Sequence, residues 1–218
     1  MFGIEKLDLL IAVYMFSVAV SELMGGKTFP VANIMGFPLN ASVAIFVLPI
    51  IFAIVDIITE ALGKKRSQSV VRSGILVVFL ILIYSLLTTH LAPSGRFKAT
   101  EPSYQAIFSV SARIAASSLI AFAVSELMDI AIFTKLRQKL GTKGLWLRTN
   151  LSNFISEFFD SFVFIFLAFY ALDKSLSSNF PFLIGLVLPY WFLKCVMSVV
   201  TTPFVYLGVR WLKEKAQG

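Results

Sequence analysis

Six long apolar stretches constrain this chain more than any other feature of its sequence. Each is close to, or longer than, the ~20 mostly apolar residues that a helix needs to cross the hydrocarbon of a bilayer. Of the 218 residues, 58% are hydrophobic and 14% charged, whereas soluble domains average about 25% charged residues. We therefore predict an all-α integral membrane protein, a single polytopic domain over 1–218, with six transmembrane helices at about 7–24, 41–62, 74–92, 106–134, 151–172 and 180–209.

Turn-rich connections such as "GGKTFPVANIMGFPLN" and "GKKRSQSVVRS" separate these stretches, and basic residues are divided unevenly among the connections. Thirteen of the 19 Lys and Arg residues lie in the N-terminal segment, the second and fourth connections and the C-terminal tail. Four lie in the other connections, and two lie inside predicted helices. Because cytoplasmic loops carry the excess of Lys and Arg, we expect a multi-pass plasma (inner) membrane protein with both termini in the cytoplasm. The net charge of +7 is then a signal of topology, and we expect no nucleic-acid partner.

The sequence offers little for cofactor or metal chemistry. Cys195 is the only cysteine and His90 the only histidine, so a disulfide within the chain is excluded and a zinc or haem site lacks ligands. No paired metal-ligand motif such as HExxH is present. We expect no cofactor and no enzyme activity.

The six letters "AVSELM" occur twice, at residues 19–24 and 123–128. The same offset of 104 residues carries Asp56 onto Asp160 and His90 onto Lys194. If the first and fourth helices run in opposite directions, the two halves form a 3+3 inverted repeat, as in many transporters whose substrate sites lie where the halves meet. Coincidence in a biased composition is the alternative.

Charged residues lie within or at the edges of the predicted helices. A charge near the bilayer centre costs about 2.5–3.5 kcal/mol on insertion scales and usually faces a bundle interior, a substrate path or a proton path. Paired ions that only lock helices together are the structural alternative. The acids outnumber the bases, Arg113 and Lys194, and are Glu22, Asp56, Glu60, Glu126, Asp129, Glu157 and Asp160.

Helical spacing gathers polar residues into stripes, because residues four apart share one face of a helix. The third stretch carries no charge before His90 and is predicted to be a lipid-facing strut. The others predict a bundle with a wet, ionisable centre. Their stripes are Arg113, Ser117, Ala121, Ser125 and Asp129; Ser152, Ser156 and Asp160; Tyr190, Lys194, Ser198 and Thr202; and Asp56 with Glu60.

Four segments spread along the chain from residue 37 to residue 206 resemble one known family. They are "FPLNASVAIFVLPIIFAIVDIITEALGKKRSQ", "ARIAASSLIAFAVSELMDIAIFTKLRQ", "LWLRTNLSNFISEFFDSFVFIFLAFYA" and "WFLKCVMSVVTTPFVY". Together they resemble the queuosine-precursor transporter family, also called the VUT family. Lys27, just after the first stretch, also resembles a recurring lysine of that family. Glu126 and Glu157 depart from the family pattern, in which amides are expected, and this departure bears on the substrate and on proton coupling.

The resemblance implies a six-helix inner-membrane importer of 7-cyano- or 7-aminomethyl-7-deazaguanine, precursors of the tRNA base queuosine. Transport would be secondary or facilitated, with proton coupling an open alternative. A lipid bilayer and a small-molecule deazapurine are the implied partners, and an oligomer is compatible with the sequence. Combined with the intramembrane charges, the resemblance gives these candidate substrate-binding residues: Lys27, Asp56, Glu60, Arg113, Ser117, Glu126, Asp129, Asn150, Glu157, Asp160 and Lys194.

The chemistry of a guanine-like ring fits these residues. Its N1–H and exocyclic amine lie on one edge, where a single carboxylate can accept both. Phe158, Phe159 and Phe162 could supply stacking faces, although packing or lipid contact is the more common role of such residues. Because the acids exceed the bases, we expect the cationic aminomethyl form to be preferred over the neutral cyano form.

A substrate-binding subunit of an ATP-driven vitamin importer is the main alternative. Such subunits also have about six helices and usually dock through small residues in the first one. Here Ala12 is followed four residues later by Phe16, which interrupts an AxxxA surface. An intramembrane enzyme ranks last, because the chain has so few catalytic side chains.

Overall fold

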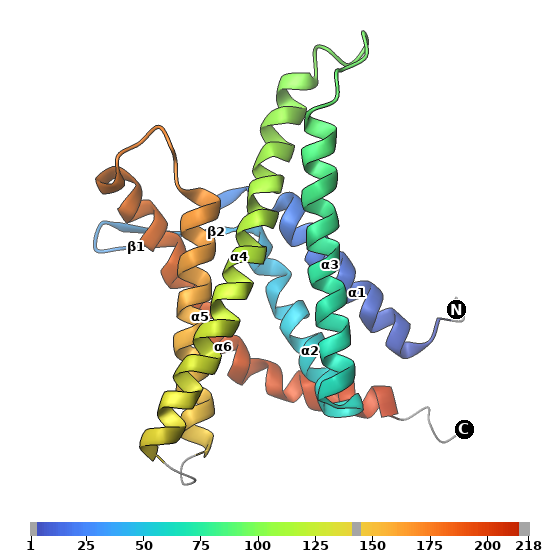
Figure 1. Ribbon diagram of the computed structural model, residues 1–218, viewed down its shortest axis with the longest axis vertical. Coiled ribbons are helices and arrows are strands. Elements are labelled where there is room, and N and C mark those ends of the chain that lie inside the picture. Colours follow the sequence, from blue (N-terminus) through green and yellow to red (C-terminus); the bar gives the residue numbers. More distant parts are fainter. Residues whose placement is uncertain (1–3, 141–144, 214–218) are drawn as a thin grey trace. The chain divides into compact units, whose positions relative to one another are not determined.

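The computed structural model describes residues 4–140 and 145–213, which are mostly helical. A two-stranded hairpin follows the first helix, and long helices make up the rest of the described chain (Figure 1). The elements are α1 (Lys6–Met24), β1 (Thr28–Ile34), β2 (Phe37–Ser42), the 3-10 turn η1 (Val43–Phe46), α2 (Leu48–Leu62), α3 (Lys64–Thr89), α4 (Glu101–Leu140), α5 (Leu145–Phe169) and α6 (Leu176–Lys213).

The described chain divides into two compact units. The first contains residues 4–28, 42–115 and 196–213, and so holds α1, α2, α3, the first part of α4 and the last part of α6. The second contains residues 29–41, 116–140 and 145–195, and so holds the hairpin, α5, the rest of α4 and the first part of α6. Both α4 and α6 therefore contribute to each unit.

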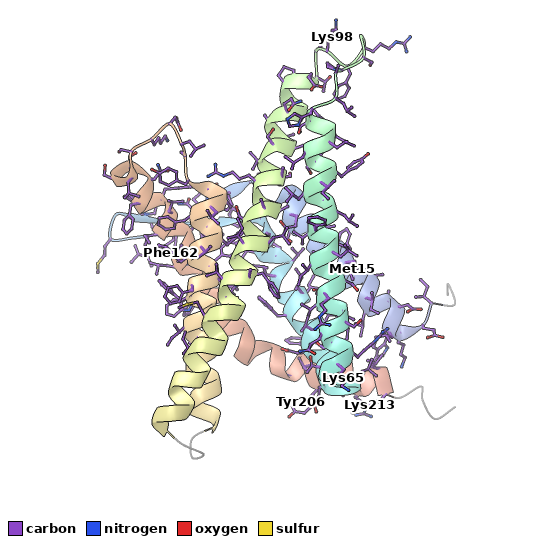
Figure 2. The ribbon with its side chains drawn as sticks, in the orientation of Figure 1. Met15, Lys65, Lys98, Phe162, Tyr206 and Lys213 are labelled. Atoms are coloured by element: carbon purple, nitrogen blue, oxygen red, sulfur yellow. The ribbon has the colours of Figure 1, made fainter. Side chains whose placement is uncertain are left out.

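In the first unit α3 packs against α1 and α2. Gly74 permits close approach, because a Cβ there would lie 2.6 Å from the hydroxyl of Tyr14. Several large apolar side chains of α3, Leu76, Phe79 and Tyr84 among them, are exposed. An apolar helix face of this kind is typical of a surface that contacts lipid. The loop that joins α3 to α4 carries Lys98 beyond the ends of both helices (Figure 2).

In the second unit the core lies between apolar residues of α5 and α6, including Ile165, Leu183 and Leu186, which are fully buried. The hairpin lies against α6 at Gly185, where a Cβ would lie 2.5 Å from the carbonyl oxygen of Pro38. Asn179 fixes the connection between α5 and α6. Its side-chain amide donates hydrogen bonds to the carbonyls of residues 171, 174 and 175 and accepts one from the amide of residue 171.

The hairpin corrects the prediction of an all-α chain. The segment that was predicted to be a turn-rich connection forms β1 and β2, joined by Met35 and Gly36. These two residues have φ values of 52° and 84°, and two consecutive positive φ angles are typical of the type I′ turn that links adjacent strands. Glycine adopts such a φ without steric cost.

Five segments are long and apolar enough to cross a membrane, as judged from the described residues. They are Lys6–Met24, Val43–Leu62, Lys65–Thr89, Glu101–Ser125 and Leu176–Val196. The predicted transmembrane helix at 151–172 is not among them, so the count of six stays a prediction. Four of the predicted boundaries shift outward, since α3, α4, α5 and α6 begin before the apolar stretches do. The prediction of a connection at "GKKRSQSVVRS" was wrong, because after Gly63 these polar residues form the first turns of α3.

Candidate functional site

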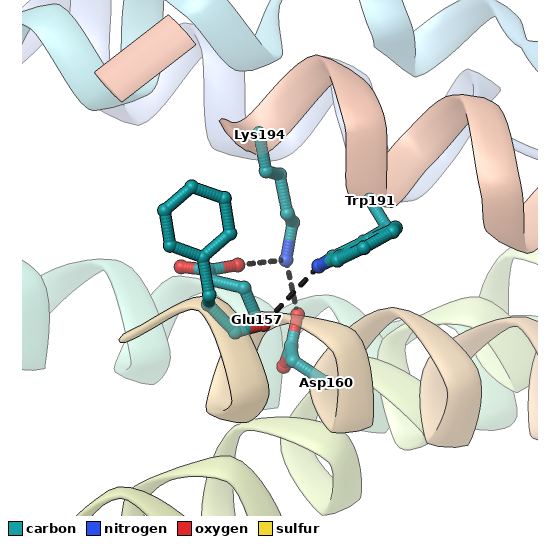
Figure 3. A network of polar contacts seen from close by, with 5 residues as sticks. Glu157, Asp160, Trp191 and Lys194 are labelled. Atoms are coloured by element: carbon teal, nitrogen blue, oxygen red, sulfur yellow. Dashed lines mark hydrogen bonds and ion pairs between the residues drawn. The ribbon is translucent and has the colours of Figure 1, made fainter. Parts of the chain in front are cut away.

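An ion cluster joins α5 to α6 in the second unit. Glu157 and Asp160 are three residues apart and therefore share one face of α5. Lys194 extends from α6 to meet them (Figure 3). Its Nζ atom lies 2.8 Å from Oε2 of Glu157 and also donates a hydrogen bond to Oδ2 of Asp160. One ammonium group thus pairs with two carboxylates.

The three side chains differ in exposure. Lys194 is 11% exposed, Asp160 24% and Glu157 40%. With both acids ionised, two negative charges face one positive charge, which leaves the cluster with a net charge of −1. Breaking a buried ion pair is costly because it leaves an uncompensated charge in a poorly solvated place. Because one negative charge is uncompensated, the cluster can accept a cation or a pair of hydrogen-bond donors without breaking its ion pairs. Glu157 is its most accessible member.

Trp191 is a neighbour of the cluster that the sequence analysis did not single out. It lies three residues before Lys194 on α6, and its indole N–H donates a 3.1 Å hydrogen bond to the carbonyl of Phe154 on α5. The indole packs edge-on against Phe158, with the ring centroids 5.6 Å apart. The only signal available in the sequence was the three-residue spacing to Lys194, which places the two side chains on one face.

Aromatic rings continue from the cluster along α5. Phe158 is stacked on Phe162 at 6.2 Å between centroids, and Phe162 on Phe166 at 4.2 Å. These rings contact one another, so their first role is packing, which is the more common role of such residues. Ser161 follows Asp160 and is fully buried, and its hydroxyl has no hydrogen-bond partner within the described part of the chain.

Three predicted site residues therefore come together, namely Glu157, Asp160 and Lys194. Asp56 and Glu60 lie on α2 in the first unit and are both exposed, whereas Ile54, Ile57 and Ile58 form the buried face of that helix. No ion pair forms at Asp56 within the residues that the structure describes. A carboxylate in so apolar a helix is unfavourable against lipid, so its exposed side requires water or a polar partner.

The remaining candidates are scattered along the chain. Arg113 on α4 is half-buried and Ser117, one turn later, is 3% exposed. Lys27 is exposed just before β1, and its backbone carbonyl accepts a 2.9 Å hydrogen bond from the amide of Val43. Glu22, which the prediction placed at a helix edge, is only 6% exposed. Three further candidates have side chains that fall outside the described residues: Glu126, Asp129 and Asn150.

A polytopic helical protein that holds an ion cluster between two of its helices is typical of membrane transporters. Residues 42–208 match the family model described as "Putative vitamin uptake transporter". The chain belongs to this family of transporters, which confirms the resemblance seen in the sequence and agrees with the expectation that the protein is not an enzyme. It is a multi-pass membrane protein.

Two curated relatives are similar over most of their length. The "Probable queuosine precursor transporter" of Bacillus subtilis is 25% identical over 174 residues, which cover 78% of this chain and 72% of the relative. The "Queuosine precursor transporter" of Escherichia coli is also 25% identical, over 171 residues that cover 77% of this chain and 71% of the relative. No solved structure matches the chain.

Proposed function

We propose that this transporter imports a queuosine precursor, 7-aminomethyl- or 7-cyano-7-deazaguanine, across the plasma (inner) membrane. Transport is secondary or facilitated, through six transmembrane helices with both termini in the cytoplasm. The names of the two curated relatives support the substrate class. The excess of basic residues in the terminal segments and in two connections supports the topology.

The observation that carries the substrate proposal is the ion cluster of Lys194, Glu157 and Asp160. Its two carboxylates meet a single ammonium, so one carboxylate is available without leaving Lys194 unpaired. Glu157, the more exposed acid, is the one that can turn toward a substrate. A carboxylate accepts the N1–H and the exocyclic amine of a deazaguanine together, and hydrogen bonds to a charged group are worth about 1.5–3 kcal/mol.

The charge of the cluster favours the aminomethyl form. The aminomethyl substituent is a cation at neutral pH, whereas the cyano substituent is neutral. A site with a net charge of −1 attracts the cation and gains little from the neutral form. The departure of Glu157 from the amide expected in the family adds to this preference.

We further propose that the two halves form a 3+3 inverted repeat. Asp56 and Asp160 support it, because each lies within the second helix of its half, α2 and α5. His90 and Lys194 support it less, because His90 follows the end of α3 whereas Lys194 lies within α6. In this proposal Asp56 and Asp160 both act in the transport path, and either can carry a proton in a coupled cycle.

The substrate-binding-subunit alternative receives little support. Phe16 is 64% exposed on α1 and projects from the surface where a small residue would be needed to dock a partner helix.

The test is uptake by cells that cannot synthesise the precursor. Expression of this chain should restore queuosine in tRNA at low external concentrations of 7-aminomethyl-7-deazaguanine, and less effectively with the cyano form. Collapse of the proton gradient tests coupling in the same cells. Failure to restore queuosine with either compound, from a chain that reaches the membrane, would refute the substrate.

A further inference from the structure

A groove with a volume of about 560 Å³ lies on the surface of the first unit. Residues of α3 from Val77 to Thr88 form its floor, and Tyr104 and Phe108 of α4 and Leu23 of α1 contribute its sides. The Oγ atom of Ser111 on α4 donates a 2.9 Å hydrogen bond to the carbonyl of Leu23, which ties the two sides together. The lining is almost wholly apolar, so the groove suits hydrocarbon.

The groove has the length of one bilayer leaflet. From Val77 to Thr88 the floor rises through eleven helical steps, or about 16 Å at ~1.5 Å per residue. Half of a hydrocarbon core of about 30 Å is about 15 Å. An acyl chain that entered from one membrane surface would therefore end near the inner limit of the groove.

One end of the groove carries the aromatic residues that are typical of a membrane interface. Tyr104 stands there with Thr88, and its ring is 4.4 Å from that of Phe108 deeper in the groove. Phe97, from the loop between α3 and α4, packs edge-on against Tyr104 at 5.7 Å. This contact fixes the loop to the wall of the groove.

The same loop supplies positive charge. Arg96 and Lys98 flank Phe97 in sequence and are both exposed. Figure 2 shows Lys98 on this loop. The neighbouring acid, Glu101, accepts a 2.7 Å hydrogen bond from the side-chain amide of Gln105, which also donates to the carbonyl of Thr89. Two cations and one acid leave this end of the groove with a net positive charge.

We propose that the groove binds one anionic glycerophospholipid. An acyl chain lies along α3, and the phosphate lies at Arg96 and Lys98. The apolar lining suits the acyl chain, and the length of the groove matches the depth of one leaflet. The positive charge at one end suits the phosphate. A second copy of this chain, seated symmetrically on the groove, would bring like charges together and is disfavoured. The inference is independent of the transported substrate.

The test is native mass spectrometry of the full-length protein in detergent, titrated with phosphatidylglycerol and with phosphatidylcholine of identical acyl chains. The wild-type protein should retain phosphatidylglycerol more tightly. In the double variant Arg96→Gln/Lys98→Gln the dissociation constant for phosphatidylglycerol should rise roughly 10- to 30-fold, because two cations that attract the anionic headgroup are lost. Binding of phosphatidylcholine should change little.

Two further variants keep the result decisive. Lys65→Gln/Lys213→Gln removes the same number of charges from exposed positions outside the α3–α4 loop and should leave the first phosphatidylglycerol bound as in wild type. Leu80→Trp, or Leu87→Trp if the first does not purify, adds bulk to the α3 floor of the groove at a side chain that is 54% or 56% exposed and should weaken both lipids alike. Equal affinity in wild type and the Arg96/Lys98 variant, equal loss in both charge pairs, or a lipid-free dimer would overturn the proposal.

Discussion

The ammonium nitrogen of Lys194 lies 2.8 Å from Oε2 of Glu157 while it also pairs with Asp160, yet the two acids are not equivalent. Asp160 is 24% exposed and Glu157 40%. Asp160 is therefore the partner that holds the ammonium, and Glu157 is the partner that can exchange it for another donor.

Removal of Lys194 should destabilise the protein more than removal of either acid. Lys194→Met leaves two carboxylates facing each other without a cation. Breaking a fully buried pair costs about 3–5 kcal/mol, and the value here should be lower because Glu157 is partly exposed. Glu157→Gln should cost less than about 1 kcal/mol, since Lys194 keeps Asp160. Thermal unfolding in detergent measures both.

The control for that series is Lys174→Gln, which removes an exposed lysine from the connection between α5 and α6. It should leave the unfolding temperature unchanged. A Lys194→Met protein as stable as the Lys174→Gln protein would contradict a stabilising ion cluster.

Neutralising Asp56 or Asp160 should impair uptake of the deazaguanine precursor. Asp56→Asn is the cleaner test, because Asp56 is exposed and forms no ion pair within the described chain, so its loss should not affect folding. Loss of a hydrogen bond to a charged group should lower uptake about 10- to 100-fold in either variant. Uptake is compared at equal amounts of protein in the membrane, and wild-type uptake by both variants would exclude a role for either acid in transport.

Trp191 should affect transport through its position beside Lys194. Trp191→Phe keeps an aromatic ring against Phe158 but leaves the Phe154 carbonyl without the indole donor, which should cost about 0.5–1.5 kcal/mol of stability. Trp191→Leu loses the ring as well. If the ring helps to hold a flat substrate, the half-saturating concentration for uptake rises in Trp191→Leu and stays near wild type in Trp191→Phe. Equal uptake kinetics in the two variants would restrict Trp191 to packing.

Apolar length located the helices well but not their polar extensions. The first predicted helix, 7–24, corresponds to Lys6–Met24. The second ends at residue 62 as predicted, but its predicted start at residue 41 was wrong, because the end of β2 and the turn η1 precede α2, which begins at Leu48. Hydropathy marks only the part of a helix that suits lipid, so it could not show that the first turns of α3 are polar. The hairpin was missed for a different reason, since its Pro and Gly residues are typical of loops as well as of strand ends.

The members of the ion cluster were predicted one by one, but their pairing was not. The energetic cost of placing a charge in lipid singled out Glu157, Asp160 and Lys194, because charged side chains within apolar helices usually have a structural or functional role. Which acid meets which base depends on the rotation and register of α5 against α6, and these are set by buried apolar contacts such as those of Ile165 and Leu186. Trp191 was missed because an aromatic residue in an apolar helix is ordinary.

Replacement of Gly63, at the junction of α2 and α3, should destabilise the protein. Its φ of 86° and ψ of 162° fall in a region that is essentially restricted to glycine, although no atom outside its immediate neighbours would touch an added Cβ. The strain is therefore in the backbone, and Gly63→Ala should cost about 1–3 kcal/mol, visible as a lower unfolding temperature in detergent. Gly95→Ala is the matched control, because Gly95 also has open space but no positive φ, and it should be neutral. Equal stability of the two variants would mean that the junction can relax into another conformation.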